Sequence, residues 1–390
     1  MILRCLLVVC CTVALGAQQP PSVDRAWDLV AAGRRDEAIA LLRRLVKTAP
    51  ANPEVRLLLG SLLMEAREEV ESLVHLEEAV RLQPQSAIAH NSLGEAYHSF
   101  GRTKAARAEF EKTVKLDPKI STAHELLGQI LLEAGEYQPA ALHLDRALAL
   151  FGRDPESAHA RYLRAKIHTE ENQIDKAVAQ LKLAVKLRPD FAEAWSDLGQ
   201  AHKAQLDDAS ALACFEKAVA LAPDGAVART RLGAEYVHQG QAAKAVPHLR
   251  VAVRLDPNNQ MALYNLQLAL REDGQLDDAA KAKQQLADLL RRRDKESQDA
   301  AIAVRLNNEG AVLEKAGNLA AAVEKYQAAL ALDPEHVGIR TNFAAALLRL
   351  GRWEQGVTEL RESLRRDPEN VALRTALEQA LAHRPKSVPQ

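Results

Sequence analysis

The stretch AWSDLGQAHKAQLDDASALACFEKAVALAP, from Ala194 to Pro223, contains the pattern that the rest of the chain repeats. Apolar and small residues recur in it at intervals of three and four, as on one side of a helix. The stretch contains two such segments, and a proline ends the second. Two short helices joined by a turn are therefore predicted. The residues that define the pattern are Trp195, Leu198, Gly199 and His202, then Ala211, Phe215 and Ala218, and finally Pro223.

Prolines at the end of this pattern recur through the chain at a regular spacing. They are Pro50, Pro84, Pro118, Pro155, Pro189, Pro223, Pro257, Pro334 and Pro368. The difference in numbering between consecutive prolines is 34 in six of the eight intervals. One interval is 37, which three extra residues at Phe151–Arg153 explain, and one is 77, which equals two units and nine residues. The sequence therefore predicts ten copies of one unit.

The unit resembles the tetratricopeptide repeat, whose pattern is W-x2-L-G-x2-Y, then A-x3-F, then P, over about 34 residues. His202 stands where that family has tyrosine. The resemblance implies an all-α solenoid, a right-handed superhelix of about ten antiparallel helix pairs with a further capping helix at the C-terminus. Each unit of such an array buries its apolar stripe only against its neighbours, so the length reports the number of repeats rather than of compact domains.

Variations of the unit set the expected organisation of the chain. Repeats one to eight should occupy residues 22–302, repeats nine and ten residues 303–370, and a capping helix residues 371–383. Residues 18–21 and 384–390 are expected to be a disordered lead and tail.

Two local departures from the unit concern individual helices. No closing proline follows repeat eight, and Arg291–Glu296 contains only good helix formers. We therefore expect the second helix of this repeat to extend from about Leu276 to near Lys295. Pro247 falls within the second helix of repeat seven and should bend that helix or delay its start.

Small and bulky residues alternate at fixed positions of the unit. Glycine or alanine at the eighth position should let the two helices approach closely. A bulky residue at the twenty-fourth position, such as Phe110, Phe215 or Tyr326, should fill the space beside it. Cys214 is expected to be a small buried residue rather than a reactive thiol.

Met1–Ala17 has the features of a secretory signal peptide. A single arginine precedes the apolar run Cys5–Leu15, which is too short for a permanent membrane span. Cleavage after Ala17 is predicted, with cleavage after Gly16 as the competing choice. Lipid attachment at a cysteine of the run and retention of the leader as an anchor remain alternatives. The mature chain is thus expected to be exported, periplasmic or secreted, with no membrane span after leader removal.

Charge and motifs limit the classes of function. The formal net charge of −1 gives no basic surplus, so nucleic acid is not an expected partner. Zincin, nucleophile-elbow and phosphate-loop motifs are absent from the sequence, which predicts neither catalytic residues nor a cofactor. His90 and His124 recur at the fourth position of consecutive repeats, where a metal pair is less expected than groove or core lining.

The class of function that remains is the binding of a partner on the surface of the repeats. In tetratricopeptide proteins the first helix of each unit lines the concave face, and the resemblance transfers the inner positions to this chain. The residues so placed are Asn91, Glu95, His98, Glu125, Gln129, Tyr162, Lys166, Gln200, Lys203, Tyr264, Asn265, Arg271, Asn307, Asn308, Asn342 and Arg349.

Two binding modes of the family can be compared with these residues. The Lys–Asn pair that grips peptide C-termini is absent from every unit, because Asn91 is followed by Glu95 at the ninth position. Asn265, Asn308 and Asn342 hold the sixth position of three successive units, which resembles an asparagine ladder that holds an extended peptide backbone. Local hydrogen bonding of these asparagines is the competing interpretation.

These features predict an exported, non-enzymatic protein that binds a protein or extended peptide in its concave groove. The alternative is a structural scaffold of an envelope or secretion complex that uses its outer face or its termini.

Overall fold

The computed structural model describes residues 22–152 and 154–383. Over these residues it contains twenty α-helices and no strand. Contacts divide the chain into two compact units, residues 1–119 and 120–390. The predicted leader and tail lie outside the described residues, and no helix of the described part is long and apolar enough to cross a bilayer.

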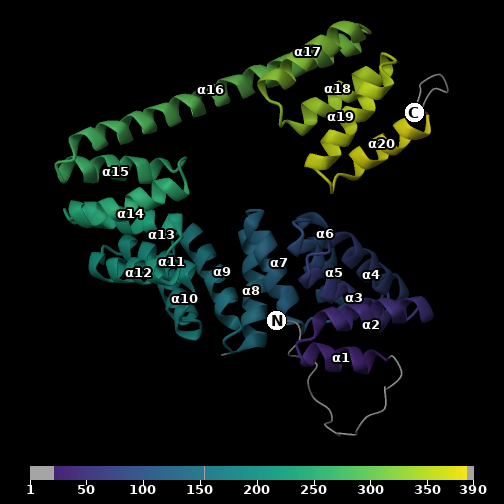
Figure 1. Cartoon of the computed structure of the whole chain (residues 1–390), viewed down its shortest axis with the longest axis horizontal. Helices are drawn as coiled ribbons and strands as arrows, with labels where there is room; N and C mark the ends of the chain where they lie inside the picture. Colours follow the sequence, from purple (N-terminus) through teal and green to yellow (C-terminus); the bar gives the residue numbers. More distant parts are fainter. Residues whose placement is uncertain (1–21, 153, 384–390) are drawn as a thin grey trace. The chain divides into compact units, whose positions relative to one another are not determined.

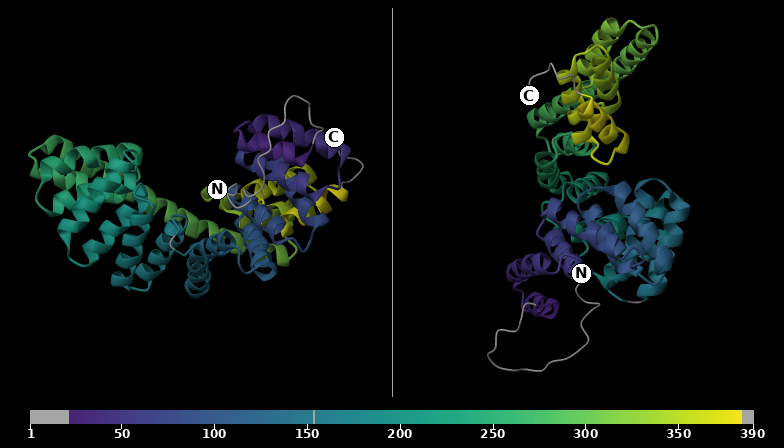
Figure 2. Two further views of the ribbon diagram at one scale, coloured as in Figure 1. Left: turned by 90° about the horizontal axis from the view of Figure 1, so that it is seen from below. Right: turned by 90° about the vertical axis from the view of Figure 1, so that its right-hand side faces the viewer.

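The first unit consists of three helix pairs, in which each helix packs against the next along the chain. Figures 1 and 2 show them in purple and blue. They are α1 (Val23–Ala31), α2 (Arg35–Thr48), α3 (Pro53–Glu65), α4 (Glu69–Leu82), α5 (Ala87–Ser99) and α6 (Thr103–Leu116).

Within the second unit, too, each helix packs against the next along the chain (Figure 1). Its first eight helices are α7 (Ser121–Glu133), α8 (Tyr137–Phe151), α9 (Ser157–Glu170), α10 (Ile174–Leu187), α11 (Ala192–Ala204), α12 (Asp208–Leu221), α13 (Ala226–His238) and α14 (Ala242–Leu255). The remaining six are α15 (Gln260–Glu272), α16 (Leu276–Lys315), α17 (Leu319–Leu332), α18 (Val337–Arg349), α19 (Trp353–Arg366) and α20 (Val371–Ala382).

Local sequence explains where these helices begin and end. The Asn52 side chain caps α3 by accepting hydrogen bonds from the backbone N–H groups of Glu54 and Val55. The turn within a repeat needs a left-handed residue, which is Gly101 in repeat three, with φ of 75°. Arg67 adopts the same conformation in repeat two, with φ of 63°, because that repeat has no glycine there.

The two helices of a unit meet at a glycine or alanine, as the sequence predicts. A Cβ atom on Gly199 would lie 2.6 Å from Phe215 Cε1, and one on Gly94 would lie 2.8 Å from Phe110 Cε1. Real Cβ atoms do not approach other atoms so closely, so the ring occupies the space that the missing side chain leaves. Cys214 is also buried, and burial raises the pKa of its thiol to about 11.

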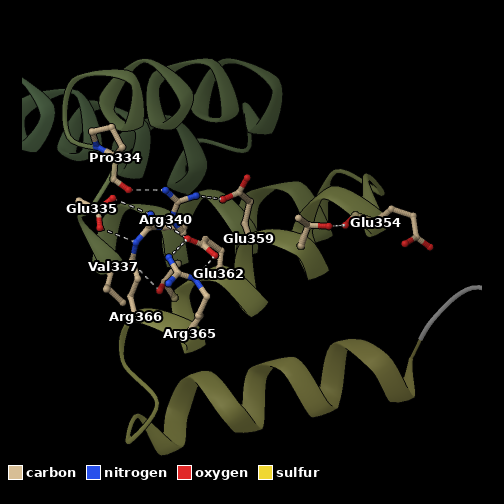
Figure 3. A network of polar contacts seen from close by, with 11 residues as sticks. Pro334, Glu335, Val337, Arg340, Glu354, Glu359, Glu362, Arg365 and Arg366 are labelled. Atoms are coloured by element: carbon tan, nitrogen blue, oxygen red, sulfur yellow. Dashed lines mark hydrogen bonds and ion pairs between the residues drawn. The ribbon is translucent and has the colours of Figure 1, made fainter. Parts of the chain in front are cut away.

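In several repeats a donor at the fourth position ties the closing loop to the unit that follows. Figure 3 shows Arg340, which donates to the carbonyl oxygen of Pro334 at 2.5 Å and forms an ion pair with Glu359 of α19. Trp195 Nε1 donates to the carbonyl oxygen of Pro189 at 2.9 Å in the same way. One side chain therefore satisfies a loop carbonyl six residues before it, which helps to fix the angle at which consecutive units stack.

The structure corrects one expectation about an individual helix and answers part of another. The sequence predicts an end of the extended helix near Lys295, whereas α16 runs on for 40 residues to Lys315. The predicted boundary between repeats eight and nine, at residues 302 and 303, therefore lies inside a helix and not in a loop. The reason is that no proline or glycine interrupts the chain between Leu276 and Ala303. Pro247 does not delay α14, which begins at Ala242, one full repeat length after the start of α12 at Asp208.

The three extra residues near Phe151 lengthen helix α8, the loop after it and helix α9 by one residue each. Helix α8 has 15 residues and α9 has 14, one more than the 14 and 13 of α6 and α7. The loop between α8 and α9 contains Gly152, whose φ of 64° ends α8, and residue 153 lies outside the described residues.

Candidate partner-binding surface

Four consecutive first helices, α9, α11, α13 and α15, present equivalent positions at intervals of one repeat length. The fifth position is occupied by Tyr162, Ser196, Thr230 and Tyr264. Ser196 and Thr230 are buried, whereas Tyr162 is half-buried and Tyr264 is 52% exposed. Two small hydroxyl residues are thus flanked in the repeat series by two tyrosines.

Two hollows lie over this row of helices. One has a volume of about 520 Å³ and is lined by α9, α11, α13 and the loop before α13. The other, of about 280 Å³, lies further along α9 and α11. Both are lined by Lys166, Asp197 and Arg231, so the two hollows adjoin at these side chains. We call the two together, with Tyr162 and Gln200 in their lining, the α9–α13 hollow.

An ion pair between neighbouring repeats forms the floor of the hollow. Arg231 Nη1 of α13 donates to Asp197 Oδ1 at 2.7 Å and to Ser196 Oγ at 2.8 Å, both on α11. Burial and the neighbouring Asp197 carboxylate raise the pKa of Tyr162, which keeps its hydroxyl protonated. The floor can therefore offer hydrogen-bond donors and acceptors to a ligand without moving a helix.

Aromatic rings gather at one edge of the hollow. The Tyr162 and Phe191 ring centroids are 4.9 Å apart, and His159 lies 6.2 Å from both. Arg188 Cζ stacks 3.4 Å from the Phe191 centroid, and Lys166 Nζ lies 5.7 Å from the Tyr162 centroid. In a chain with only 4% aromatic residues, such a cluster beside an open surface is typical of a recognition site.

Many of the groove residues expected from the sequence are bonded within or between repeats. Lys203 Nζ lies 2.6 Å from Glu235, Asn342 donates to Asn307 at 2.9 Å, and Arg349 pairs with Glu314. The other engaged residues are Glu125, which bonds His159, Gln129, which bonds Glu133, and Asn91, which bonds the buried Glu95. His98, on the same helix as Glu95, is half-buried.

The remaining expected residues are open to a ligand. Lys166, Gln200, Tyr264, Arg271 and Asn308 are all exposed. Of these, Lys166 and Gln200 line the hollow, together with the half-buried Tyr162. The accessible part of the expected set is therefore divided: Lys166 and Gln200 lie at the hollow, whereas α15 and α16 carry Tyr264, Arg271 and Asn308.

The structure separates the members of the expected asparagine ladder. Asn265 donates to the carbonyl oxygen of Met261 at 2.8 Å, which is the local bonding that competed with a ladder. Arg293 of α16 contacts Gln260 at the start of α15. Asn308 lies 15 residues further along α16, or about 22 Å at the rise of an α-helix. The length of α16 therefore interrupts the row.

Sequence reasoning missed Asp197, Arg231 and Phe191. The first two stand at the sixth position of their repeats, which the family pattern places on the inner face, so position could have identified them. Phe191 lies in a loop, where the repeat pattern gives no signal, and only the folded loop brings it to Tyr162.

His90 and His124, the two histidines that recur at the fourth position, are both bonded to protein groups. His90 Nδ1 lies 2.5 Å from Glu109 and its Nε2 lies 3.1 Å from the carbonyl oxygen of Pro84, while His124 pairs with His143. One further group, Asp208, Glu235 and His238, brings three ligand atoms together. The Lys203 ammonium lies 3.2 Å from Asp208 and 2.6 Å from Glu235, so the cation at that place is a lysine.

Comparison with protein families finds matches along most of the chain. Models described as "Tetratricopeptide repeat" match residues 29–72, 71–119, 101–158, 192–224, 230–296 and 313–381, and one described as "TPR repeat" matches residues 165–205.

Among curated proteins, the human Protein O-mannosyl-transferase TMTC1 is 25% identical over 142 residues, which is 36% of this chain. The chain spans 16% of the length of that relative. Among solved structures, YrrB, described as a TPR protein with an unusual peptide-binding site, is 22% identical, with a TM-score of 0.41 over 48% of this chain and 95% of YrrB. A tetratricopeptide repeat protein from Parabacteroides merdae is 17% identical, with a TM-score of 0.48 over 64% of this chain and 97% of that one.

Proposed function

The chain belongs to the tetratricopeptide repeat family, and we propose that it binds an extended segment of a partner protein in the α9–α13 hollow. Members of this family mostly serve protein–protein interaction rather than catalysis. The face that a member uses depends on its own residues.

The observation that carries the proposal is the shared lining of the two hollows. Lys166, Asp197 and Arg231 come from three successive first helices and face the same open space. Gln200 adds an exposed carboxamide, which can donate to and accept from a peptide backbone. Rigid helices hold these groups, so little ordering entropy is lost on binding.

Photo-crosslinking tests the site of contact. A crosslinking residue replaces Gln200 in the hollow and, as a control, Gln284 on the exposed side of α16. We expect a protein adduct from the Gln200 position that Lys166→Glu with Arg231→Glu abolishes, and none from Gln284. Adducts of equal yield at the two positions would argue against the hollow and for a scaffold that binds through its outer face or termini.

We also propose that the protein is exported and acts without catalysis or a cofactor. The support for export is the composition of Met1–Ala17, and for a binding role the family itself. The test for export is the intact mass of the chain recovered from the envelope or medium of an expressing cell. A mature N-terminus at Gln18 is expected, and a chain that begins at Met1 and stays inside the cell would overturn this part.

A further inference from the structure

The middle of α16 is a helical segment without buried side chains. The buried residues of α16 are Ala279, Ala282, Leu289, Ala303 and Gly310, so none of residues 290–302 is buried. Every side chain over residues 291–298 is exposed, and we call this stretch the unpacked segment. Helix α15 packs near one end of α16 and α17 near the other, as Figure 1 shows. A single helix surrounded by water therefore joins the packed helices on its two sides.

Helix α14, the second helix of the preceding repeat, shows what the unpacked segment lacks. Buried residues recur in α14 every three or four positions, as at Ala245, Leu249 and Ala252. In α16 the interval from Leu289 to Ala303 is about 21 Å along the helix axis. Opening of α14 would expose apolar side chains to water, whereas opening of the unpacked segment exposes none that is buried in the fold.

Few bonds of the side chains oppose opening of the segment. Arg291 pairs with Asp288 in the same helix, and both side chains are exposed, so the pair adds little stability. Arg293 lies 3.3 Å from Gln260 Oε1 and 3.4 Å from the carbonyl oxygen of Asn258, beyond the usual hydrogen-bond distances. A helix of about this length is marginal in water without packing. The unpacked segment should therefore open at a lower free energy than the packed helices.

The unpacked segment also contains a cluster of basic residues, Arg291, Arg292, Arg293 and Lys295. Endoproteases of the trypsin class bind a substrate in an extended conformation and hydrolyse the peptide bond after arginine or lysine. Water adds across that bond, the C–N bond breaks, and the products carry a new carboxylate and a new ammonium group. A helix that opens locally can present these bonds to such an enzyme while the rest of the chain stays folded.

Basic residues in the turns between helices are held more firmly. Arg67 Nη1 donates to the carbonyl oxygen of Ser99 at 3.0 Å, and Arg102 Nη2 donates to Glu69 at 2.7 Å. Packed helices lie on both sides of each turn. An extended conformation there requires buried residues to leave the core, which raises the free energy of opening.

We propose that residues 291–298 are a processing site, at which an endoprotease specific for basic residues divides the folded protein between repeats eight and nine. The cut separates repeats nine and ten, with α20, from the rest of the chain. Ala303 packs with Ala329 and Ile339 on the C-terminal side of the segment, so this contact survives the cut. The proposal concerns α16 alone and does not rest on the α9–α13 hollow, which stays whole in the N-terminal product.

The test is digestion of the full chain by a small amount of trypsin in native buffer, with the products identified by intact mass. We expect the earliest cut inside any helix to follow Arg291, Arg292, Arg293 or Lys295. In a parallel digestion, a protease that cuts after glutamate should have its earliest helical site at Glu296. An earlier cut inside another helix, with either protease, would overturn the proposal.

Substitutions that change helix propensity separate local opening from unfolding of the whole chain. Ser297→Gly should be cut about fivefold faster than Ser297→Ala, because glycine favours the open form of the segment by about that factor. The matched control is Ala213→Gly at an exposed position of the packed α12, which should leave the rate of the cut in α16 unchanged. Acceleration of this cut by Ala213→Gly as large as by Ser297→Gly would show that cutting follows unfolding of the whole array, and the proposal would then be wrong.

Discussion

The Tyr236 hydroxyl of α13 donates a hydrogen bond of 2.6 Å to Glu216 Oε1 of α12, across the joint between two successive repeats. Tyr97 of α5 makes the equivalent bond of 2.8 Å to Glu77 of α4. In each case the carboxylate stands 20 residues before the tyrosine. A tyrosine of the repeat pattern thus both fills the joint with its ring and anchors its hydroxyl on the preceding second helix.

Removal of one such hydroxyl should lower stability without disturbing packing. Burial and the bond to Glu216 raise the pKa of Tyr236 to about 12, so the hydroxyl is a donor at neutral pH. Tyr236→Phe should reduce the free energy of unfolding by about 1 kcal/mol, measured by urea denaturation. Tyr264→Phe is the control, because that hydroxyl is exposed and should not affect stability.

His202 offers a complementary prediction, because it replaces tyrosine at this position. The residue at the place that Glu216 holds for Tyr236 is Lys182, and burial together with that lysine lowers the pKa of His202. His202→Tyr alone should gain little, since the exposed Lys182 can only donate to the tyrosine oxygen and leaves the hydroxyl proton without an acceptor. Adding Lys182→Glu should restore the pair, with a favourable coupling of about 0.5–1 kcal/mol in a double-mutant cycle. Additive effects of the two substitutions would show that the pair is not formed.

The sequence predicts the repeat fold well, because each unit obeys the same local rules. The spacing of prolines and the glycine before Phe110, Phe215 or Tyr326 correspond to real helix ends and real contacts. The C-terminal end of helix α16 is harder to predict from the sequence. Without a proline or glycine the helix can continue where other repeats have a loop, and no local residue marks where it ends.

The accessible surface is less predictable than the fold. Position within the repeat places Lys166 and Gln200 on the inner face, but it places Lys203 and Asn342 there equally. Whether such a side chain is open depends on its partner one repeat away, Glu235 for Lys203 and Asn307 for Asn342. That pairing is set by the stacking of helices and cannot be read from one unit.

The contact of Gly199 with Phe215 gives a prediction about packing. Gly199→Ala places a methyl group within the space of the ring and should cost about 1–3 kcal/mol of unfolding free energy. Phe215→Leu should relieve this cost, because Ala165 stands at the eighth position of the preceding repeat and Leu181 at its twenty-fourth. In thermal unfolding, the double variant should therefore lose less unfolding free energy than the sum of the losses in the two single variants. Strict additivity would contradict the contact.

Glu95 gives a prediction about pH. Burial on the inner side of α5 raises the pKa of this carboxyl from 4.5 to about 7, against the bond from Asn91 Nδ2 at 2.8 Å. A raised carboxyl pKa means that the folded chain holds its proton more tightly than the unfolded chain. The contribution of Glu95 to stability is therefore full below pH 4.5 and is lost as pH rises toward 7. Glu95→Gln should remove this loss, so that urea midpoints at pH 8 exceed those of the parent chain while midpoints at pH 4 agree. The exposed Glu170→Gln is the matched control, and a parent chain whose pH profile equals that of Glu95→Gln would show that folding does not raise the pKa of Glu95.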